Sequence, residues 1–306
     1  MTVEPVLGTM TFGDTVNADT AGRMLDLALD AGVTGVDTAN GYAAGASEEI
    51  LGTLLRGRRS RVKLATKAGI PHPDAAGHAP LSPTGLRLSL EGSLRRLGTD
   101  HVDLFYLHQP DRATPLGSTL ATVADLMAEG KIGSLGVSNY AAWQIALLNP
   151  RPVVAQQLYN LLARRVEDEY AEFAVTSGLR TMVYNPLGGG LLTGRHRFDQ
   201  APGAGRFGDS RLAAMYRQRY WDAELFKAVE ALGAIALEAG VPPAELSLRW
   251  LLGKPMVNAV LLGASDPGHL RANLSALAAG PLPADVSAAC DAVGDALRGP
   301  MPAYSR

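Results

Sequence analysis

The sequence predicts an α/β protein in which parallel strands close into a barrel with helices outside it. Short apolar runs alternate with segments of helical periodicity along the 306 residues. The alternation repeats eight times, and eight such units favour a (β/α)8 TIM barrel. No linker or change in composition interrupts the chain, so one domain spanning residues 1–306 is expected. An open, doubly wound sheet is the alternative fold.

In the first half of the chain, each predicted strand precedes a segment with helical spacing. The strands are expected at residues 6–10, 33–36, 62–67 and 102–107. A first helix should cover residues 19–30, and a second should begin at Ser47, a capping hydroxyl followed by two acids. Ser82-Pro83 should cap a third helix, in which leucines recur every three or four residues. The apolar run before His108 is typical of a strand buried on both faces.

In the second half, the strands are expected at residues 132–137, 153–155, 182–184 and 257–262. A helix containing Leu120 and Met127 precedes the first of them. The main irregularity is residues 188–220, which are too long and too rich in glycine, arginine and tyrosine for a simple connection. Segments of this kind in compact domains are usually functional or disordered, so a role beyond joining two elements is expected.

Composition limits the classes of partner. The chain carries 28 Lys and Arg against 30 Asp and Glu, so it lacks the general basic field that favours nucleic acid. Its first residues do not resemble a signal peptide, and no apolar run approaches the ~20 residues of a membrane helix. We therefore predict a cytoplasmic protein. The single cysteine, Cys290, excludes an intramolecular disulfide, and no metal-ligand spacing such as HExxH is present.

The stretch at residues 35–42, GVDTANGY, carries the first candidate chemistry. Asp37 follows the second strand, and Tyr42 lies five positions later, beyond an Asn-Gly turn. Taken alone, the pair is equally well explained by a capping carboxylate and a tyrosine on an apolar flank. Other polar residues also follow the strands: Lys67, His108, Ser138, Asn139, Gln156, Tyr184 and Asn185. Because strand ends share one rim of a barrel, these side chains should form a ring.

Asp37, Tyr42, Lys67 and His108 make chemical sense as a proton-transfer unit. A phenol titrates near ~10, and a neighbouring ammonium would lower its pKa, bringing Tyr42 closer to use as a general acid at neutral pH. Asp37 would hold Lys67 charged and in place, and His108 would hydrogen-bond a substrate oxygen. Such a unit protonates an oxygen that becomes negative, as a carbonyl oxygen does when hydride arrives at its carbon.

None of these side chains can donate hydride, so a cofactor must supply it. Asn139 and Gln156 are amides suited to the carboxamide of nicotinamide, and Tyr184 offers a flat face for its ring. Two segments resemble nucleotide-binding motifs but do not satisfy their requirements. Residues 203–208 have the spacing of the dinucleotide fingerprint but follow a polar loop, and residues 189–196 lack the Lys and Ser/Thr of a P-loop.

Over essentially the whole chain, the sequence resembles the aldo-keto reductase superfamily. The motifs that carry the resemblance are GVDTA at 35–39, LFYLH at 104–108, GVSNY at 136–140, YNPL at 184–187 and GLLTG at 190–194. Three further segments are similar to the branch of aflatoxin aldehyde and succinic semialdehyde reductases: SNYAAW at 138–143, MYRQRYW at 215–221 and PAYSR at 302–306. The resemblance implies a barrel enzyme that reduces small carbonyl compounds.

The resemblance also implies a role for each part of the rim. Tyr42 would be the general acid, with Asp37, Lys67 and His108 completing the catalytic set. NADPH would lie across the barrel mouth, under the long loops, held by Asp37, Ser138, Asn139, Gln156, Tyr184, Asn185, Pro186, Leu187, Gly189, Gly190, Leu191, Gly194, Arg195, Arg206, Gly263, Ala264, Ser265, His269 and Asn273. The substrate would contact His108, and a substrate carboxylate would meet Tyr216, Arg219 and the C-terminal Arg306.

The sequence departs from the superfamily at a few positions. His269 stands where Gln or Arg is usual, and Arg271-Ala272 replaces polar or acidic residues near the adenine. A neutral histidine cannot clamp a 2′-phosphate as arginine does, so NADH is an alternative cofactor. Leu212 replaces a tryptophan common in the branch, which predicts a more open pocket. Arg217 and Arg219 lie two positions apart on a helix, so at most one should face that pocket.

Three functions are compatible with these residues. The first is NADPH-dependent reduction of small aldehydes, semialdehydes or dicarbonyls to alcohols. The second is reduction of a ketone, such as a keto sugar or a polyketide side chain, in a biosynthetic pathway. The third is a non-catalytic regulatory subunit that binds nicotinamide. The expected partner is a small carbonyl compound rather than a nucleic acid or a membrane, and the resemblance implies a homodimer.

Overall fold

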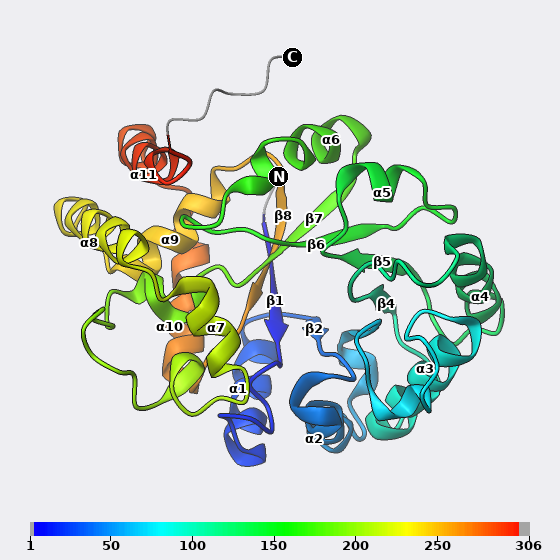
Figure 1. Ribbon diagram of the computed structural model, residues 1–306. Helices are drawn as coiled ribbons and strands as arrows, with labels where there is room; N and C mark the ends of the chain where they lie inside the picture. Colours follow the sequence, from blue (N-terminus) through cyan, green and yellow to red (C-terminus); the bar gives the residue numbers. More distant parts are fainter. Residues whose placement is uncertain (1–2, 300–306) are drawn as a thin grey trace.

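The structure, a computed structural model that describes residues 3–299, is a closed barrel of eight parallel strands (Figure 1). The strands follow one another around the barrel in chain order, and β8 pairs with β1 to close it. They are β1 (Glu4–Gly8), β2 (Gly35–Asp37), β3 (Lys63–Ala68), β4 (Leu104–Leu107), β5 (Leu135–Ser138), β6 (Val154–Leu158), β7 (Arg180–Tyr184) and β8 (Val257–Leu262). The predicted barrel is confirmed, and the open sheet is wrong.

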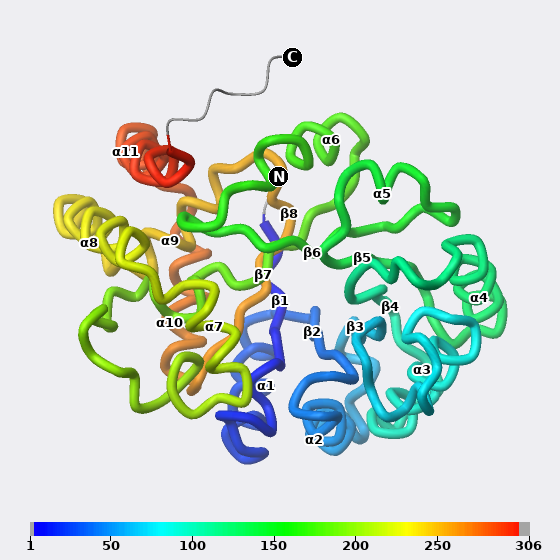
Figure 2. Tube along the Cα trace, viewed as in Figure 1, coloured from blue at the N-terminus to red at the C-terminus, as the bar shows by residue number. Residues whose placement is uncertain are grey.

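Helices cover the outside of the barrel, and Figure 2 shows them as an outer ring joined by loops to the central strands. Within the described part of the chain they are α1 (Ala18–Asp30), α2 (Ala46–Leu54), α3 (Pro83–Leu97), α4 (Leu116–Ala128), α5 (Ala142–Ala146), α6 (Tyr170–Ser177), α7 (Ala213–Tyr220), α8 (Ala223–Glu238), α9 (Pro243–Leu252), α10 (Pro267–Ala278) and α11 (Ala284–Ala296). Among residues 3–299, no helix has the length and apolar character needed to cross a membrane.

Of the two helix caps predicted from the sequence, one is found in the structure and the other is not. Ser82 caps α3 as predicted: its hydroxyl accepts from the backbone N–H of Gly85, and Pro83 takes the first helical position. The predicted cap of α2 is wrong, because that helix begins at Ala46 and the Ser47 side chain is buried inside it. The Ser47 hydroxyl instead donates to the carbonyl of Thr9, which ties α2 to the end of β1.

The barrel interior is filled by a compact set of side chains, comprising Val6, Ala65, Tyr106, Val154, Met182 and Ala259. The Tyr106 ring is the largest of them and lies directly against Gly136 of β5. A Cβ at Gly136 would come within 2.6 Å of a Tyr106 ring carbon, so only glycine leaves room for the ring. The ring therefore forms an apolar floor beneath the rim, with the Lys67 Nζ 5.6 Å from its centroid.

Residues 188–220 fold onto the barrel as three short helical pieces. These are η5 (Gly188–Thr193), η6 (Gly205–Phe207) and α7. Phe207, a residue of η6, is completely buried. Asp14, in the loop after β1, fixes this segment to the rim by accepting from the Ser210 hydroxyl at 2.6 Å and the Arg211 N–H at 3.0 Å. The long connection is therefore an ordered wall beside the barrel mouth.

Candidate active site

The polar residues that follow the strands meet at one end of the barrel. Asp37, Ser138 and Tyr184 are the last residues of β2, β5 and β7. Lys67 lies one position before the end of β3, and His108 follows β4 directly. Because all the strands are parallel, these side chains belong to the same rim.

Lys67 is the centre of the cluster and is completely buried. Its Nζ donates to the Asp37 carboxylate, to the Thr38 carbonyl at 2.8 Å and to the Tyr42 hydroxyl at 3.2 Å. An ammonium has three N–H donors, and each has an acceptor here. The second carboxylate oxygen of Asp37 accepts from Nε2 of Gln156 at 3.0 Å. A buried charge is tolerated only when it is paired and hydrogen-bonded in this way.

The ion pair keeps Lys67 charged although it is out of water. Burial lowers the pKa of Lys67, but the Asp37 carboxylate and the Tyr42 hydroxyl together outweigh this effect, so the net shift raises the pKa and favours the ammonium. Burial raises the pKa of the Asp37 carboxyl group, against the opposing effects of Lys67 and Gln156. Lys67 is therefore a fixed cation held directly beside the Tyr42 hydroxyl.

Tyr42 is held between Lys67 and His108. Its ring meets the imidazole edge-on, with 6.0 Å between ring centroids and 83° between planes. Burial raises the pKa of Tyr42 above its ordinary value, and Lys67 only partly offsets this. The sequence led us to expect a lowered pKa for Tyr42, and that expectation is wrong. The phenol is removed from water in the fold, and this burial could not be seen from the residue types. Tyr42 therefore carries its proton at neutral pH, and the nearby cation would favour its release to an acceptor.

His108 is neutral in this environment. Burial and the charge of Lys67 lower its pKa to about 3. Its Nδ1 is buried and has no hydrogen-bond partner within residues 3–299. An imidazole with this pKa cannot act as a cationic acid near neutral pH, and it can still exchange a hydrogen bond with an oxygen placed at the rim.

The backbone after Tyr42 is strained. Tyr42 opens the short helix η1 (Tyr42–Gly45), in which Ala43 and Ala44 have φ values of 48° and 55°. Left-handed backbone of this kind costs an L-residue other than glycine on the order of 1–2 kcal/mol. The sequence shows the preceding Asn-Gly turn, but two alanines give no signal for this conformation, so sequence reasoning missed it.

The residues predicted to hold nicotinamide form one network. Asn139 has a left-handed φ of 62°, and its Nδ2 donates to the His108 carbonyl and to the Ser138 hydroxyl, both at 3.0 Å. The Tyr184 hydroxyl donates to Oδ1 of Asn139 at 2.7 Å. A hydroxyl, an amide and an aromatic face thus lie together beside the Lys67 cluster. Gln156 is buried and directed at Asp37. This set of donors and acceptors fits a carboxamide attached to a flat ring.

The loop predicted to hold the cofactor diphosphate has the backbone and the charges needed to bind an anion. Gly188, Gly189 and Gly190 all have positive φ, at 58°, 71° and 101°, so the loop can take a path closed to other residues. The Arg195 guanidinium lies over Gly190 and forms no ion pair within residues 3–299. Arg206 has one distant carboxylate, 3.6 Å away at Asp14. The Arg195 and Arg206 side chains therefore lack a close carboxylate partner among the described residues, and two such cations beside a glycine loop fit a bound diphosphate.

The neighbouring part of the rim, after β8, is less suited to a further phosphate. Gly263, Ala264 and Ser265 form the loop after β8, and Asn273 is buried on α10. His269 Nδ1 lies 2.6 Å from Asp266 Oδ2, and Asp266 also caps α10 by accepting from the His269 N–H. Asp266 was not among the predicted site residues. Its position just before a proline at the first turn of α10 is the cap signal that would have found it.

The predicted substrate residues lie on α7. The ring of Tyr216 is buried, and a Cβ on Gly189 would come within 2.6 Å of it. The guanidinium carbons of Arg206 and Arg219 lie 5.2 and 5.9 Å from the centre of that ring. Arg219 is exposed and makes no ion pair in the described residues, whereas Arg217 donates to the Phe207 carbonyl. Leu191, Gly194 and Leu212 lie in the long segment at residues 188–220, and Pro186 and Leu187 directly precede it. Arg306 lies outside the described residues.

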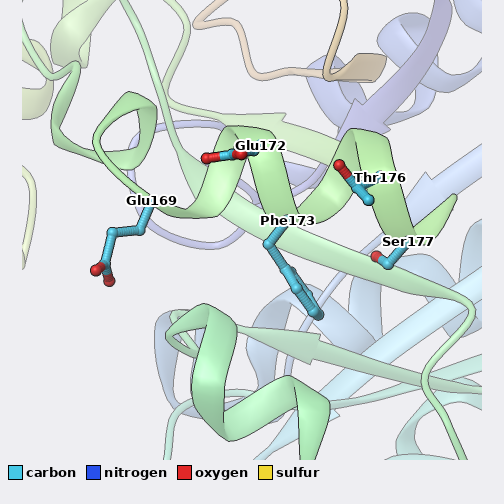
Figure 3. Close-up of a pocket in the computed structure, with 5 residues that line it drawn as sticks. All are labelled: Glu169, Glu172, Phe173, Thr176 and Ser177. Carbon is cyan, nitrogen blue, oxygen red and sulfur yellow. The ribbon is translucent and has the colours of Figure 1, made fainter. Parts of the chain in front are cut away.

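A separate depression lies on the outer surface, on and beside α6 (Figure 3). It is lined by Glu169, Glu172, Phe173, Thr176 and Ser177, and its volume is about 380 Å³. These residues belong to one helix and its first flanking position, and none of them is part of the hydrogen-bonded cluster around Lys67. We place the active site at the strand ends because the buried charges and the fixed phenol are there.

Comparison with known proteins identifies the family. Residues 6–295 match the Aldo/keto reductase family. The chain belongs to this family. It is similar to aldo-keto reductase family 7 member A3 of Homo sapiens, with 41% identity over 308 residues, covering 92% of this chain and 91% of that protein. Aflatoxin B1 aldehyde reductase member 2 of Homo sapiens is 40% identical, covering 94% and 85%.

A third relative has a different kind of name. The probable voltage-gated potassium channel subunit beta of Oryza sativa subsp. japonica is 34% identical, covering 89% of this chain and 86% of that protein. The resemblance stated from sequence motifs is therefore confirmed at the level of the family. As an aldo/keto reductase, the chain is an oxidoreductase of a group that typically uses nicotinamide cofactors.

Proposed function

We propose that the protein reduces small aldehydes and ketones to alcohols, with NADPH as hydride donor and Tyr42 as general acid. The observation that carries the proposal is the buried cluster in which Lys67 donates to both Asp37 and Tyr42. A protonated phenol beside a fixed cation is suited to give its proton to an oxygen on which negative charge develops. The relatives named as aldehyde reductases support this chemistry.

Each residue of the cluster has a distinct task in this proposal. Tyr42 donates its proton to the carbonyl oxygen, and Lys67 stabilises the phenolate that remains. Asp37 holds Lys67 in position and keeps it charged. Neutral His108 donates a hydrogen bond to the same substrate oxygen and so orients it. The apolar floor of Tyr106 beneath Lys67 excludes water, which strengthens these interactions.

The nicotinamide cofactor supplies hydride when it is bound. Ser138, Asn139 and Gln156 would hold its carboxamide, and Tyr184 would face its ring. The diphosphate would lie against Gly188 to Gly190, close to the Arg195 and Arg206 side chains described above. NADH is the alternative, because the Asp266 carboxylate stands beside His269 at the end where the 2′-phosphate of NADPH is expected.

The substrate class follows from Arg219. This exposed cation lies beside Tyr216 and Tyr184 and has no carboxylate partner in residues 3–299. Burial raises the pKa of both phenols, and Arg219 offsets only part of that effect. A carbonyl compound with a carboxylate a few carbons away, such as a semialdehyde, would supply the missing charge. A neutral keto sugar or polyketide ketone would not use it.

The experiment compares loss of NADPH absorbance with succinic semialdehyde and with a neutral aldehyde of equal length, for the wild type and for Arg219→Ala. We expect the acid to be preferred by the wild type and the preference to disappear in the variant. Fast turnover of both aldehydes by the wild type would instead favour neutral ketones and dicarbonyls as substrates.

A regulatory subunit is the second candidate, favoured by the similarity to the probable potassium channel subunit beta of Oryza sativa subsp. japonica. Cofactor binding without turnover of any carbonyl compound would support it. The complete Lys67 cluster favours the enzyme, since a protein that only binds nicotinamide has no use for a proton donor at that position.

A further inference from the structure

Glu48 has no task in the mechanism above, yet it is completely buried. It lies in the first turn of α2, six positions after Tyr42. One carboxylate oxygen accepts from the Thr66 hydroxyl at 2.5 Å, and the other accepts from Nε of Arg96 at 2.8 Å. Burying a carboxylate is costly even when it is paired, so a stable helix start alone does not account for it.

Arg96 extends this contact to a second carboxylate. It lies near the end of α3, and its two terminal nitrogens donate to the two oxygens of Asp74 at 3.0 and 2.6 Å. Asp74 belongs to the connection between β3 and α3. A guanidinium that binds one carboxylate with its fork and another with Nε is held in a single orientation. The Glu48–Arg96–Asp74 cluster therefore links α2, α3 and the segment that follows β3.

The backbone closes tightly around this cluster at two glycines. A Cβ on Gly45, which has a φ of 99°, would come within 3.0 Å of the Arg96 side chain. A Cβ on Gly92 would come within 2.4 Å of the Asp74 carboxylate. Gly45 is also the last residue of η1, the turn that begins at Tyr42. The arginine thus packs directly on the end of the strained turn.

The other end of the same turn is fixed to β3 through the backbone. The Asn40 N–H donates to the Lys67 carbonyl at 3.2 Å, and the Thr38 N–H donates to the Ala65 carbonyl at 2.9 Å. Glu48 is bonded to Thr66, the residue between these two positions. The segment that carries Tyr42 is therefore attached to β3 on both sides, and Ala43 and Ala44 are strained between the two attachments.

We propose that Glu48 is a positioning residue, which acts through Arg96 and Thr66 to hold the strained turn so that the Tyr42 hydroxyl stays on Lys67. Strained backbone persists only where its surroundings over-determine it, and the strain here would otherwise relax and withdraw the phenol. This inference rests on the proposed function, because it assigns Tyr42 the proton transfer. It concerns the chemical step and leaves substrate and cofactor binding unaffected.

The test is Glu48→Gln, which keeps the shape of the side chain and an acceptor for Thr66 but removes the charge held by Arg96. We expect kcat to fall at least tenfold, with KM for the carbonyl compound and Kd for the cofactor changed less than about twofold. In a Tyr42→Phe background, Glu48→Gln should have almost no further effect on the remaining turnover, because its effect passes through the phenol. An equal loss in both backgrounds would overturn the proposal.

Asp103→Asn is the matched control. Asp103 anchors the opposite end of β3, where it accepts from the Leu64 N–H and from Arg59, both at 2.8 Å. The control also removes the charge of an ion pair whose carboxylate is bonded to this strand, but at the end of β3 away from Lys67 and Tyr42. It should leave kcat within about twofold of the wild type. If it lowers kcat as much as Glu48→Gln does, the effect is a general loosening of β3 and the proposal is wrong.

A readout independent of turnover separates this inference from the proposed function. Amide hydrogen exchange followed by mass spectrometry should show residues 42–46 exchanging at least tenfold faster in Glu48→Gln and unchanged in Asp103→Asn. If no carbonyl compound is reduced but this difference is found, the proposed function fails and the positioning stands. If residues 42–46 exchange at the wild-type rate in Glu48→Gln, the positioning role of Glu48 is wrong. If Glu48→Gln does not fold, Arg96→Lys, which keeps the charge and loses the fork, replaces it with the same expected directions.

Discussion

The Tyr42 hydroxyl lies 3.2 Å from the Lys67 ammonium, and the other two donors of that ammonium are occupied by Asp37 and the Thr38 carbonyl. The phenol is therefore part of a closed set of hydrogen bonds rather than a side chain free to move. A proton that leaves Tyr42 leaves behind an anion that already has a cation in contact with it.

Replacing Tyr42 with Phe should lower kcat by about 10²–10⁴, the usual contribution of a positioned general acid. The ring and its edge-on contact with His108 remain, so Kd for the cofactor should change less than about threefold. Steady-state kinetics and a fluorescence titration measure the two quantities. Tyr106→Phe is the control: this phenol also lies near Lys67, but its hydroxyl donates to the Met182 sulfur instead of contacting the ammonium. Equal activity of Tyr42→Phe and the wild type would remove Tyr42 from the mechanism.

Stability should depend on pH through His108. Its pKa is about 3 in the folded protein, against an ordinary value near ~6.5. Between these values the unfolded chain binds a proton that the folded protein does not, so this contribution is fully present above pH ~6.5 and declines as pH falls toward ~3. Urea unfolding at a series of pH values should show a shallower decline for His108→Gln than for the wild type. Identical slopes would show that this imidazole is not held neutral.

The choice between the two nicotinamide cofactors should respond to His269 and Asp266. An Asp266→Ser, His269→Arg double variant removes a carboxylate and adds a permanent cation at the position where His269 and Asp266 pair. We expect the affinity for NADPH relative to NADH to rise at least tenfold, about 1.4 kcal/mol. Binding titrations with both cofactors measure the ratio. An unchanged ratio would place the 2′-phosphate elsewhere on the rim.

Replacing Ala44 with Gly should stabilise the protein. Ala44 has a φ of 55°, where glycine has no steric cost, and the entropy that glycine loses on folding offsets part of the gain. We expect an increase of about 0.5–1 kcal/mol in the free energy of unfolding. Gly117→Ala is the control, because it exchanges the same two residue types at an unstrained position. The φ of Gly117 is not positive, and no atom lies within 4 Å of the position of an added Cβ. A destabilised Ala44→Gly would mean that the turn is not strained.

The barrel and the rim residues could be predicted because they follow simple periodic signals. Each apolar run ends in a polar residue, and parallel strands bring those residues together, as with Lys67 and His108. Strand limits were less accurate: the run at 102–107 suggested a longer strand than β4, because Val102 forms only an isolated bridge with Ile132. Pairing begins where a neighbouring strand is in register, which an apolar run does not show.

The parts that could not be predicted depend on partners distant in the sequence. Glu48 reads as an ordinary acid in the first turn of a helix, and only the fold brings Arg96 to it across 48 positions. The pKa of Tyr42 was expected to fall because the sequence indicated the nearby Lys67 ammonium. It did not indicate the burial of the phenol, which raises the pKa. Asp14 gives no sign that it holds a segment 196 positions away.

The pairing of β1 with β8 also sets an order of events during synthesis. The ribosome releases β1 first, but its partner β8 lies at Val257–Leu262, near the other end of the chain. Until that strand emerges, β1 has one open side and the segment fixed by Asp14 has no complete wall to lie on. The barrel mouth is therefore completed last, and a chain shortened before β8 would carry most of the candidate site residues without the closed barrel that holds them together.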